Sequence, residues 1–204
     1  MSVPTPILAS QSPRRKELLG LILPAFSVQV SDADEALAPG TSPMAAVEQL
    51  ALRKAAAVLG LQKDPGKVVV IGSDTVVSID GRILGKPHSR EDCLEMLQTL
   101  SGREHLVHTG VALLRGEDRR VFTETAGVEF WPLSREEIDW YASTPEPYDK
   151  AGGYGVQGLG SLLVRGVRGD YYTVMGLPVS RLWRELREFA PELFAGAPAW
   201  MPTV

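Results

Sequence analysis

The chain has 204 residues, of which 44% are hydrophobic and 23% charged, and its formal net charge is −4. These values are ordinary for a globular protein with a buried core, and they leave no basic stripe of the kind that duplex nucleic acid requires. No apolar run approaches the roughly 18 residues needed to span a bilayer.

The first third of the chain predicts two units of strand and helix. Each strand is an apolar or alternating run. Each helix opens with Ser-Pro, where the serine can cap the helix and the proline suits the first helical position. In chain order, the elements are a strand at 6–9, a helix from Pro13 to Gly20 capped by Ser12, a strand at 26–32 and a helix at 41–60.

The rest of the chain mixes hairpins with shorter helices. Asp80-Gly81 is a typical hairpin turn, and Ser134 with Glu137 forms a capping box. In chain order, the elements are a hairpin at 67–87, a helix at 88–102, two strands at 105–132, a helix at 134–144, a glycine-rich irregular segment at 145–160, a strand and a turn at 161–178, an amphipathic helix at 179–190 and a tail at 191–204. This pattern predicts an α/β fold, a mixed twisted sheet with flanking helices, in one domain over residues 1–190 followed by a tail.

Two arginines stand at the start of the first helix, where acidic side chains are usually preferred. Arg14 and Arg15 follow a strand end, and Ser10 and Ser12 add hydroxyl groups. A helix N-terminus with serines and guanidinium groups can cradle a phosphate without glycines. The alternative is a simple Ser-Pro cap followed by solvated arginines.

Carboxylates follow two of the predicted strands. Asp74 comes two residues after the run VVVIG, at a position that often holds a base or metal ligand in open α/β sheets. The DADE segment supplies Asp32, Asp34 and Glu35 after the strand at 26–32. Mg²⁺ and Mn²⁺ take such oxygen ligands together with phosphates. Either group could instead be an ordinary polar turn.

Lysines and a glycine-rich loop add further groups that suit a nucleotide. Lys54 and Lys86 could pair with phosphate, although single lysines are commonly solvated. In the loop YDKAGGYGVQGLG, glycines permit close backbone approach, Gln157 could read a base edge and Tyr154 could stack on it. The alternative is a flexible loop without a ligand. The spacing is not that of a P-loop.

Together these segments resemble the Maf family of nucleoside triphosphate pyrophosphatases. The matching segments occur in family order and span residues 7–179: ILASQSPRRKELL, the pair at 34–35, LALRKA, GSDTVV, LGKP, YDKAGGYGVQGLG and GLPV. The resemblance implies a fold like that of inosine triphosphate pyrophosphatases, with two lobes around a cleft. It also implies cleavage of a nucleotide to the monophosphate and pyrophosphate.

The resemblance assigns roles to individual residues. It makes Asp74 the proton acceptor, which activates water or helps to hold a divalent cation, Mg²⁺ or Mn²⁺. Glu35 is then a further candidate metal ligand. The residues expected to hold the phosphates are Ser10, Arg15, Lys54 and Lys86.

The family divides by substrate, and three positions mark the branches. Arg14, Thr75 and Gln157 match the branch that resembles dTTP/UTP pyrophosphatases, whereas the branch acting on 7-methyl-GTP tends to have Trp, Gln and Glu. A glutamine amide offers a donor and an acceptor to a pyrimidine edge, while a glutamate suits the donor-rich edge of guanine.

Two other functions use the same groups. One is a nucleotide-binding regulator of septum formation with incidental hydrolysis, and the other is a nucleotidyltransferase. We expect a nucleoside triphosphate as partner, no duplex nucleic acid and no membrane, and the resemblance suggests a homodimer. The single cysteine, Cys93, and an opening segment unlike a signal peptide predict a cytoplasmic protein.

Overall fold

A mixed sheet runs through the computed structural model, which describes residues 3–30 and 32–195. Over these residues seven strands pair in the order β2-β1-β3-β5-β6-β7, with β4 beside β3. Strand β1 is parallel to both β2 and β3, and the other pairs are antiparallel. The strands are β1 (Thr5–Ala9), β2 (Ser27–Val28), β3 (Val68–Ile79), β4 (Arg82–Leu84), β5 (Glu104–Arg115), β6 (Asp118–Phe130) and β7 (Val164–Arg168).

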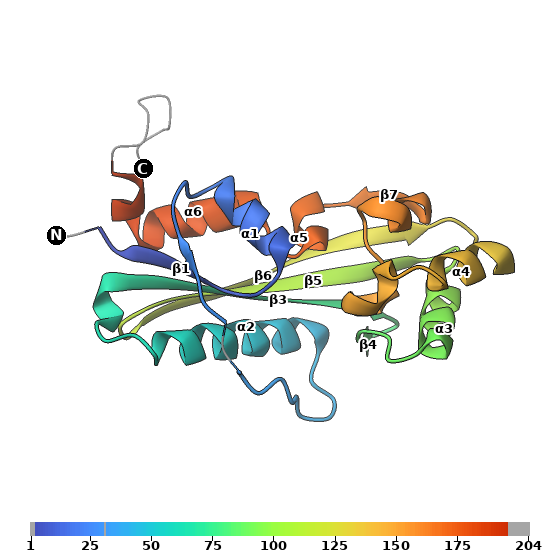
Figure 1. Ribbon diagram of the computed structural model, residues 1–204, viewed down its shortest axis with the longest axis horizontal. Helices are drawn as coiled ribbons and strands as arrows, with labels where there is room; N and C mark the ends of the chain where they lie inside the picture. Colours follow the sequence, from blue (N-terminus) through green and yellow to red (C-terminus); the bar gives the residue numbers. More distant parts are fainter. Residues whose placement is uncertain (1–2, 31, 196–204) are drawn as a thin grey trace.

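Helices cover both faces of the sheet. The α-helices are α1 (Pro13–Gly20), α2 (Pro43–Leu59), α3 (Arg90–Leu100), α4 (Arg135–Ala142), α5 (Tyr171–Met175) and α6 (Val179–Phe189). Short 3-10 helices are η1 (Pro65–Lys67), η2 (Glu146–Asp149), η3 (Ala151–Gly153), η4 (Gly158–Leu162) and η5 (Pro191–Phe194). Helix α2 lies on one face, and α1, α5 and α6 lie on the other (Figure 1).

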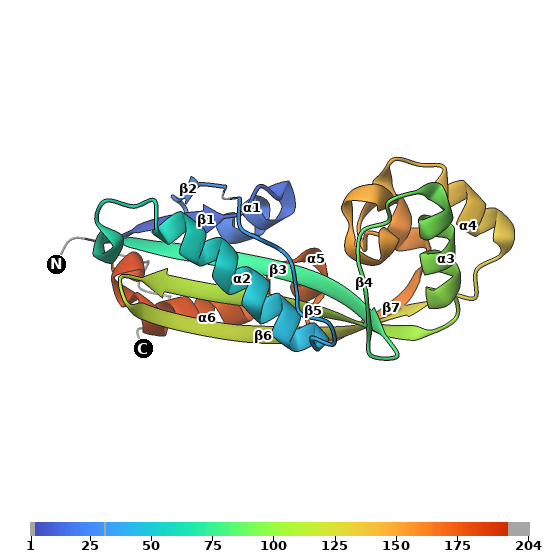
Figure 2. The same cartoon turned by 90° about the horizontal axis from the view of Figure 1, so that it is seen from below.

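The long strands β3, β5 and β6 connect two lobes, which lie side by side along the sheet (Figure 2). The first lobe carries α1, α2, α5 and α6, and its two cores pack on opposite faces of β1 and β3. The second lobe carries α3, α4, β4 and β7 around a core that includes Leu97, Phe130 and Tyr141.

Most of the expected elements are confirmed, including their caps. Ser12, Ser42, Ser89 and Ser134 each accept a hydrogen bond from a backbone N–H of the helix that follows. The Ser134–Glu137 capping box is formed. Asp80 and Gly81 both have positive φ, as a tight turn between two strands requires. The mixed α/β sheet with flanking helices is thus the observed architecture.

Two of the expected elements were wrong in detail. The strand expected at 26–32 is only the two residues of β2, which pair with β1 at the sheet edge and are both exposed. With neither face packed, little holds a longer strand there; residue 31 lies outside the described residues. The turn expected within 161–178 contains helix α5, capped by Asp170 and ended by Gly176 in a left-handed conformation.

The C-terminal segment begins against the first lobe. In η5, Leu193 and Phe194 pack on the core beside α6. Residues 196–204 of the expected tail lie outside the described residues, and the domain boundary at 190 stays a prediction. In the part of the chain described, no helix has the length and apolar character to cross a membrane.

Candidate active site

The candidate site lies where strand β1 ends and its neighbour β3 continues. The last pair between the two strands is Ala9 with Gly72, and β3 then runs on beside β5 to Ile79. Asp74 therefore lies within β3, paired with Gly110, and does not end a strand as expected. It lies two residues beyond Gly72, the last residue of β3 that pairs with β1, so its carboxylate lies just past the end of β1.

The N-terminus of α1 closes over this gap. Ser12 caps the helix by accepting from the N–H of Arg15, and the Ser10 hydroxyl accepts from the N–H of Ser12. Both serines thus shape the turn between β1 and α1. The arginines follow within the first turn, so their side chains start from a backbone that is already fixed.

The Arg15 guanidinium is held entirely by neutral oxygens. Nε donates to the carbonyl of Gly176 at 2.9 Å, Nη2 to Oγ1 of Thr75 at 3.0 Å and Nη1 to Oγ of Ser10 at 3.5 Å. Within the described residues it forms no ion pair with a carboxylate. Burial lowers the pKa of Arg15, and the nearby charge of Arg14 acts in the same direction, while Asp74 and Glu35 oppose it.

Lys54 joins the two carboxylates that the sequence predicts as metal ligands. Its Nζ lies 2.5 Å from Oδ1 of Asp74 and 2.7 Å from Oε1 of Glu35. The DADE loop reaches this position because Arg53, the neighbouring residue on α2, donates to the carbonyls of Asp34 and Ala36. The hydrogen bond from Lys54 is the main reason that the pKa of Glu35 lies below its ordinary value, with Lys86 and Arg15 adding to it.

The second lobe faces the same place. Lys86 follows β4 and is exposed, yet its charge acts on Glu35. On the glycine-rich segment, burial would raise the pKa of Asp149, but the hydrogen bond and charge of Lys150 and the charge of Arg14 lower it. Arg14 and Lys86 therefore connect the lobes electrostatically across the gap.

The base-reading residues of the glycine-rich segment are only partly as expected. Gln157 is exposed, as a residue that contacts a ligand must be. Tyr154 cannot stack on a base, because its side chain is buried. It is 5% exposed, its hydroxyl shares a hydrogen bond with Nε2 of His105, and its ring packs on Phe130. The Tyr154 ring is part of the apolar core of the second lobe.

Glu146 anchors that segment and was not predicted from the sequence. Its Oε2 accepts from the N–H of Leu159, and its Oε1 accepts from the N–H of Gly160 and from the Tyr141 hydroxyl. Burial would raise the pKa of Glu146, but these hydrogen bonds lower it. The loop that presents Gln157 is thus tied at its far end to one carboxylate.

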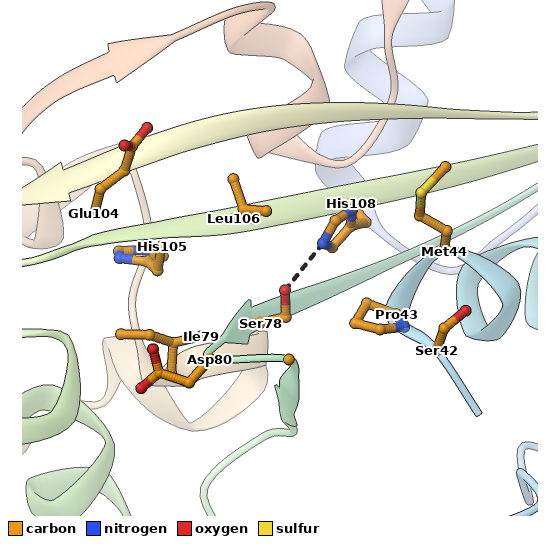
Figure 3. A pocket seen from close by; sticks show the side chains of 11 residues that line it. Ser42, Pro43, Met44, Ser78, Ile79, Asp80, Glu104, His105, Leu106 and His108 are labelled. Atoms are coloured by element: carbon orange, nitrogen blue, oxygen red, sulfur yellow. Dashed lines mark hydrogen bonds between the residues drawn. The ribbon is translucent and has the colours of Figure 1, made fainter. Parts of the chain in front are cut away.

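A separate pocket of about 470 Å³ lies at the N-terminus of α2, and none of the predicted site residues lines it (Figure 3). His108 hydrogen-bonds to Ser78 there. The charged residues around it are Asp80 and Glu104. Because both are acidic, a polyphosphate would be repelled from this pocket, whereas Arg15, Lys54 and Lys86 attract it at the other site.

The comparisons with known proteins agree over nearly the whole chain. The family described as Maf-like protein matches residues 5–189. A dTTP/UTP pyrophosphatase of Bacillus cereus is 50% identical over 90% of this chain and 94% of its own. Those of Bacillus cytotoxicus and Bacillus velezensis are each 51% identical over 90% of this chain and 94% and 95% of theirs. Among solved structures, the chain is similar to the Staphylococcus aureus Ham1 protein, with a TM-score of 0.48 and 17% identity over 78% of this chain and 79% of that one.

Proposed function

The chain belongs to the Maf family, and from that membership we propose that it hydrolyses dTTP and UTP to the monophosphate and pyrophosphate. It is a nucleoside triphosphate pyrophosphatase. Relatives that are about 50% identical over 90% of the chain are named dTTP/UTP pyrophosphatase. Those names support the pyrophosphatase and give no support to the septum-formation regulator or the nucleotidyltransferase.

The observation that carries this function is the arginine without a carboxylate partner. Among the described residues, only neutral oxygens hydrogen-bond to the partly buried Arg15 guanidinium, while Asp74 and Glu35 act on it through their charge alone. A desolvated cation is unfavourable unless an anion accompanies it. A phosphate group at the N-terminus of α1 would supply that anion and would lie at the positive end of the helix dipole.

Ser10 and two lysines complete the proposed phosphate site. Ser10 lies at the mouth of the turn, Lys54 reaches in from α2 and Lys86 from the second lobe. Charges fixed in advance on three elements stabilise the negative charge that builds up on a phosphate under attack. We assign Asp74 the role of proton acceptor for the attacking water, since its side chain is only 13% exposed and its carboxylate lies beside Lys54 at the proposed phosphate site.

The carboxylates fit a divalent cation, which we propose to be Mg²⁺ or Mn²⁺. Asp74 and Glu35 both contact one ammonium group, so oxygens from each face a common point. The described residues hold no cluster of three or more acidic, histidine or cysteine side chains that could bind a metal, so this site offers two carboxylates only. Sites with one or two carboxylates are typical where substrate phosphates supply further ligands. Such a cation would neutralise phosphate charge, while Asp74 and Glu35 hold it.

The base is proposed to be read by Arg14 and Gln157, with Thr75 as the third position that marks the branch. Arg14 and Gln157 come from the two lobes that face each other. An exposed amide on a loop anchored by Glu146 can offer both a donor and an acceptor to a pyrimidine. We also propose a cytoplasmic homodimer, which rests on the family resemblance and the single cysteine.

The test is pyrophosphate release from a panel of nucleotides with Mg²⁺ or Mn²⁺. We expect release from dTTP and UTP and little from purine triphosphates. Tight binding of these nucleotides without any release would contradict the hydrolase. Release only when an acceptor alcohol or second nucleotide is added would instead indicate a transferase.

A further inference from the structure

A row of three threonines lies behind Arg15 and leads away from the site. Oγ1 of Thr75 lies 3.0 Å from Nη2 of Arg15 and 2.9 Å from Oγ1 of Thr109, and the latter lies 2.7 Å from the carbonyl oxygen of Thr173. Thr109 is completely buried on β5, directly opposite Thr75 on β3. It lies too far inside to meet a substrate.

The groups at the two ends of this row set the direction of each hydrogen bond in it. The carbonyl of Thr173 can only accept, so the Thr109 hydroxyl must donate to it. The Thr75 hydroxyl must then donate to Thr109, which leaves the oxygen of Thr75 free to accept from Arg15. The guanidinium can only donate, so all three bonds agree in direction.

We propose that Thr109 is a positioning residue: through Thr75 it fixes the oxygen that orients the Arg15 guanidinium toward the phosphates. This inference rests on the proposed function only for the identity of the ligand. Without the Thr109 hydroxyl, the Thr75 proton has no acceptor in the row, and its hydroxyl is free to turn that proton toward Arg15. A hydrogen atom facing the guanidinium repels it where a lone pair had held it.

The other side of Arg15 is fixed in a comparable way. The carbonyl of Gly176 accepts from both Nε of Arg15 and the buried Ser73 hydroxyl. Gly176 has a φ of 109°, and a Cβ there would lie 3.3 Å from Oγ1 of Thr75 and 3.4 Å from Nε of Arg15. Thr75 on β3 and Gly176 after α5 thus hold the guanidinium from two sides. Thr109 orients the hydroxyl of Thr75, which is one of these two contacts.

The test compares Thr109→Val with Thr109→Ser, alone and in an Arg15→Ala background. Two quantities are measured: binding of inorganic pyrophosphate by calorimetry, and kcat/KM for dTTP. Thr123→Val is the matched control, because that threonine hydroxyl donates to Glu48 on the α2 face and does not touch the row. We expect Thr109→Val to weaken pyrophosphate binding and kcat/KM by about 10-fold or more. Thr109→Ser and Thr123→Val should stay within about 3-fold of the unchanged protein.

In the Arg15→Ala background, Thr109→Val should have no additional effect, since its action passes through Arg15. Normal pyrophosphate binding by Thr109→Val would overturn the inference, and so would an equal loss in the Arg15→Ala background. If Thr109→Val does not fold, Thr75→Val breaks the same row one bond nearer Arg15 and must give the same loss. A protein that releases no pyrophosphate from dTTP or UTP, but whose pyrophosphate binding depends on Thr109, would contradict the proposed function alone.

Discussion

The ammonium of Lys54 lies 2.5 Å from Oδ1 of Asp74, so helix α2 delivers a cation directly to the carboxylate on β3. The same ammonium contacts Glu35 at 2.7 Å. Two carboxylates share one lysine, which leaves a net negative charge at the point where a divalent cation would bind. The arrangement links the proposed proton acceptor, the proposed metal ligands and one phosphate-binding cation in a single contact.

Replacing the proposed proton acceptor should abolish turnover without unfolding the protein. We expect Asp74→Asn to lower pyrophosphate release by at least about 100-fold, because an amide cannot take a proton from water. Circular dichroism should show an unchanged fold. Asp80→Asn is the matched control, since Asp80 pairs with Arg103 at an exposed turn and should keep near-normal activity. Near-normal release by Asp74→Asn would remove this residue from its role.

Lys54 should matter for phosphate binding more than for stability. We expect Lys54→Met to lower kcat/KM for dTTP by about 10-fold to 100-fold, because a fixed positive charge beside the phosphates is lost. Lys67→Met, which breaks an exposed pair with Asp64, should have no effect. An unchanged kcat/KM in Lys54→Met would show that this lysine only neutralises Asp74 and Glu35.

Local signals predicted the elements better than they predicted the contacts between them. Ser-Pro caps and the Asp80-Gly81 turn act over a few neighbouring residues, so the sequence was sufficient for them. The length of β3 depends on its pairing with β5, which is distant in sequence, and Asp74 was therefore misplaced at a strand end.

The supporting residues of the site were missed for the same reason. Thr109 has no local motif, and its place opposite Thr75 follows only from the strand register. Glu146 contacts backbone groups more than ten residues away. Gly176 and Ser73 do lie in segments that carry the family resemblance, which was the available signal for them. Tyr154 was misassigned because no local pattern showed that a core would enclose it.

Glu146 should control both loop stability and substrate choice. In Glu146→Gln, one side-chain oxygen becomes an amide donor, so one of the N–H groups of Leu159 and Gly160 loses its acceptor. Because these hydrogen bonds are exposed or part-buried, the loss amounts to about 1 kcal/mol, which urea unfolding would detect. The preference for dTTP over other nucleotides should weaken as Gln157 loses its fixed position. Glu129→Gln, at an exposed pair with Arg165, is the control; an equal loss there would argue against a specific anchor.

The selectivity positions can be tested by exchange. Arg14→Trp with Thr75→Gln and Gln157→Glu should shift preference toward 7-methyl-GTP, because a carboxylate accepts from the donor-rich edge of guanine. Thr75→Gln also removes the oxygen that holds Arg15, so it should slow turnover of every nucleotide. The pair Arg14→Trp and Gln157→Glu separates the two effects. An unchanged substrate profile in both variants would place selectivity elsewhere.

The buried His105 should make the fold sensitive to mild acid. Burial lowers the pKa of His105 from 6.5 to about 4. As the pH falls below 6.5, His105 takes up a proton in the unfolded chain but stays neutral in the folded protein. The contribution of His105 to the free energy of unfolding is therefore fully present above pH 6.5 and declines toward pH 4. The decline amounts to at most about 3 kcal/mol for this group. His108, whose pKa burial also lowers, acts in the same direction.

The measurement is urea unfolding at a series of pH values from about 8 to about 4.5, for the unchanged protein and for His105→Gln. The variant starts less stable, because it loses the bond to Tyr154 and the contact with Phe130. Its stability should nevertheless fall less steeply with acid, since the titrating ring is gone. His88→Gln is the matched control, because that histidine is exposed and should leave the slope unchanged. If His105→Gln and the unchanged protein lose stability in parallel, the acid sensitivity has another source, and His105 is protonated as readily in the folded state as in the unfolded chain.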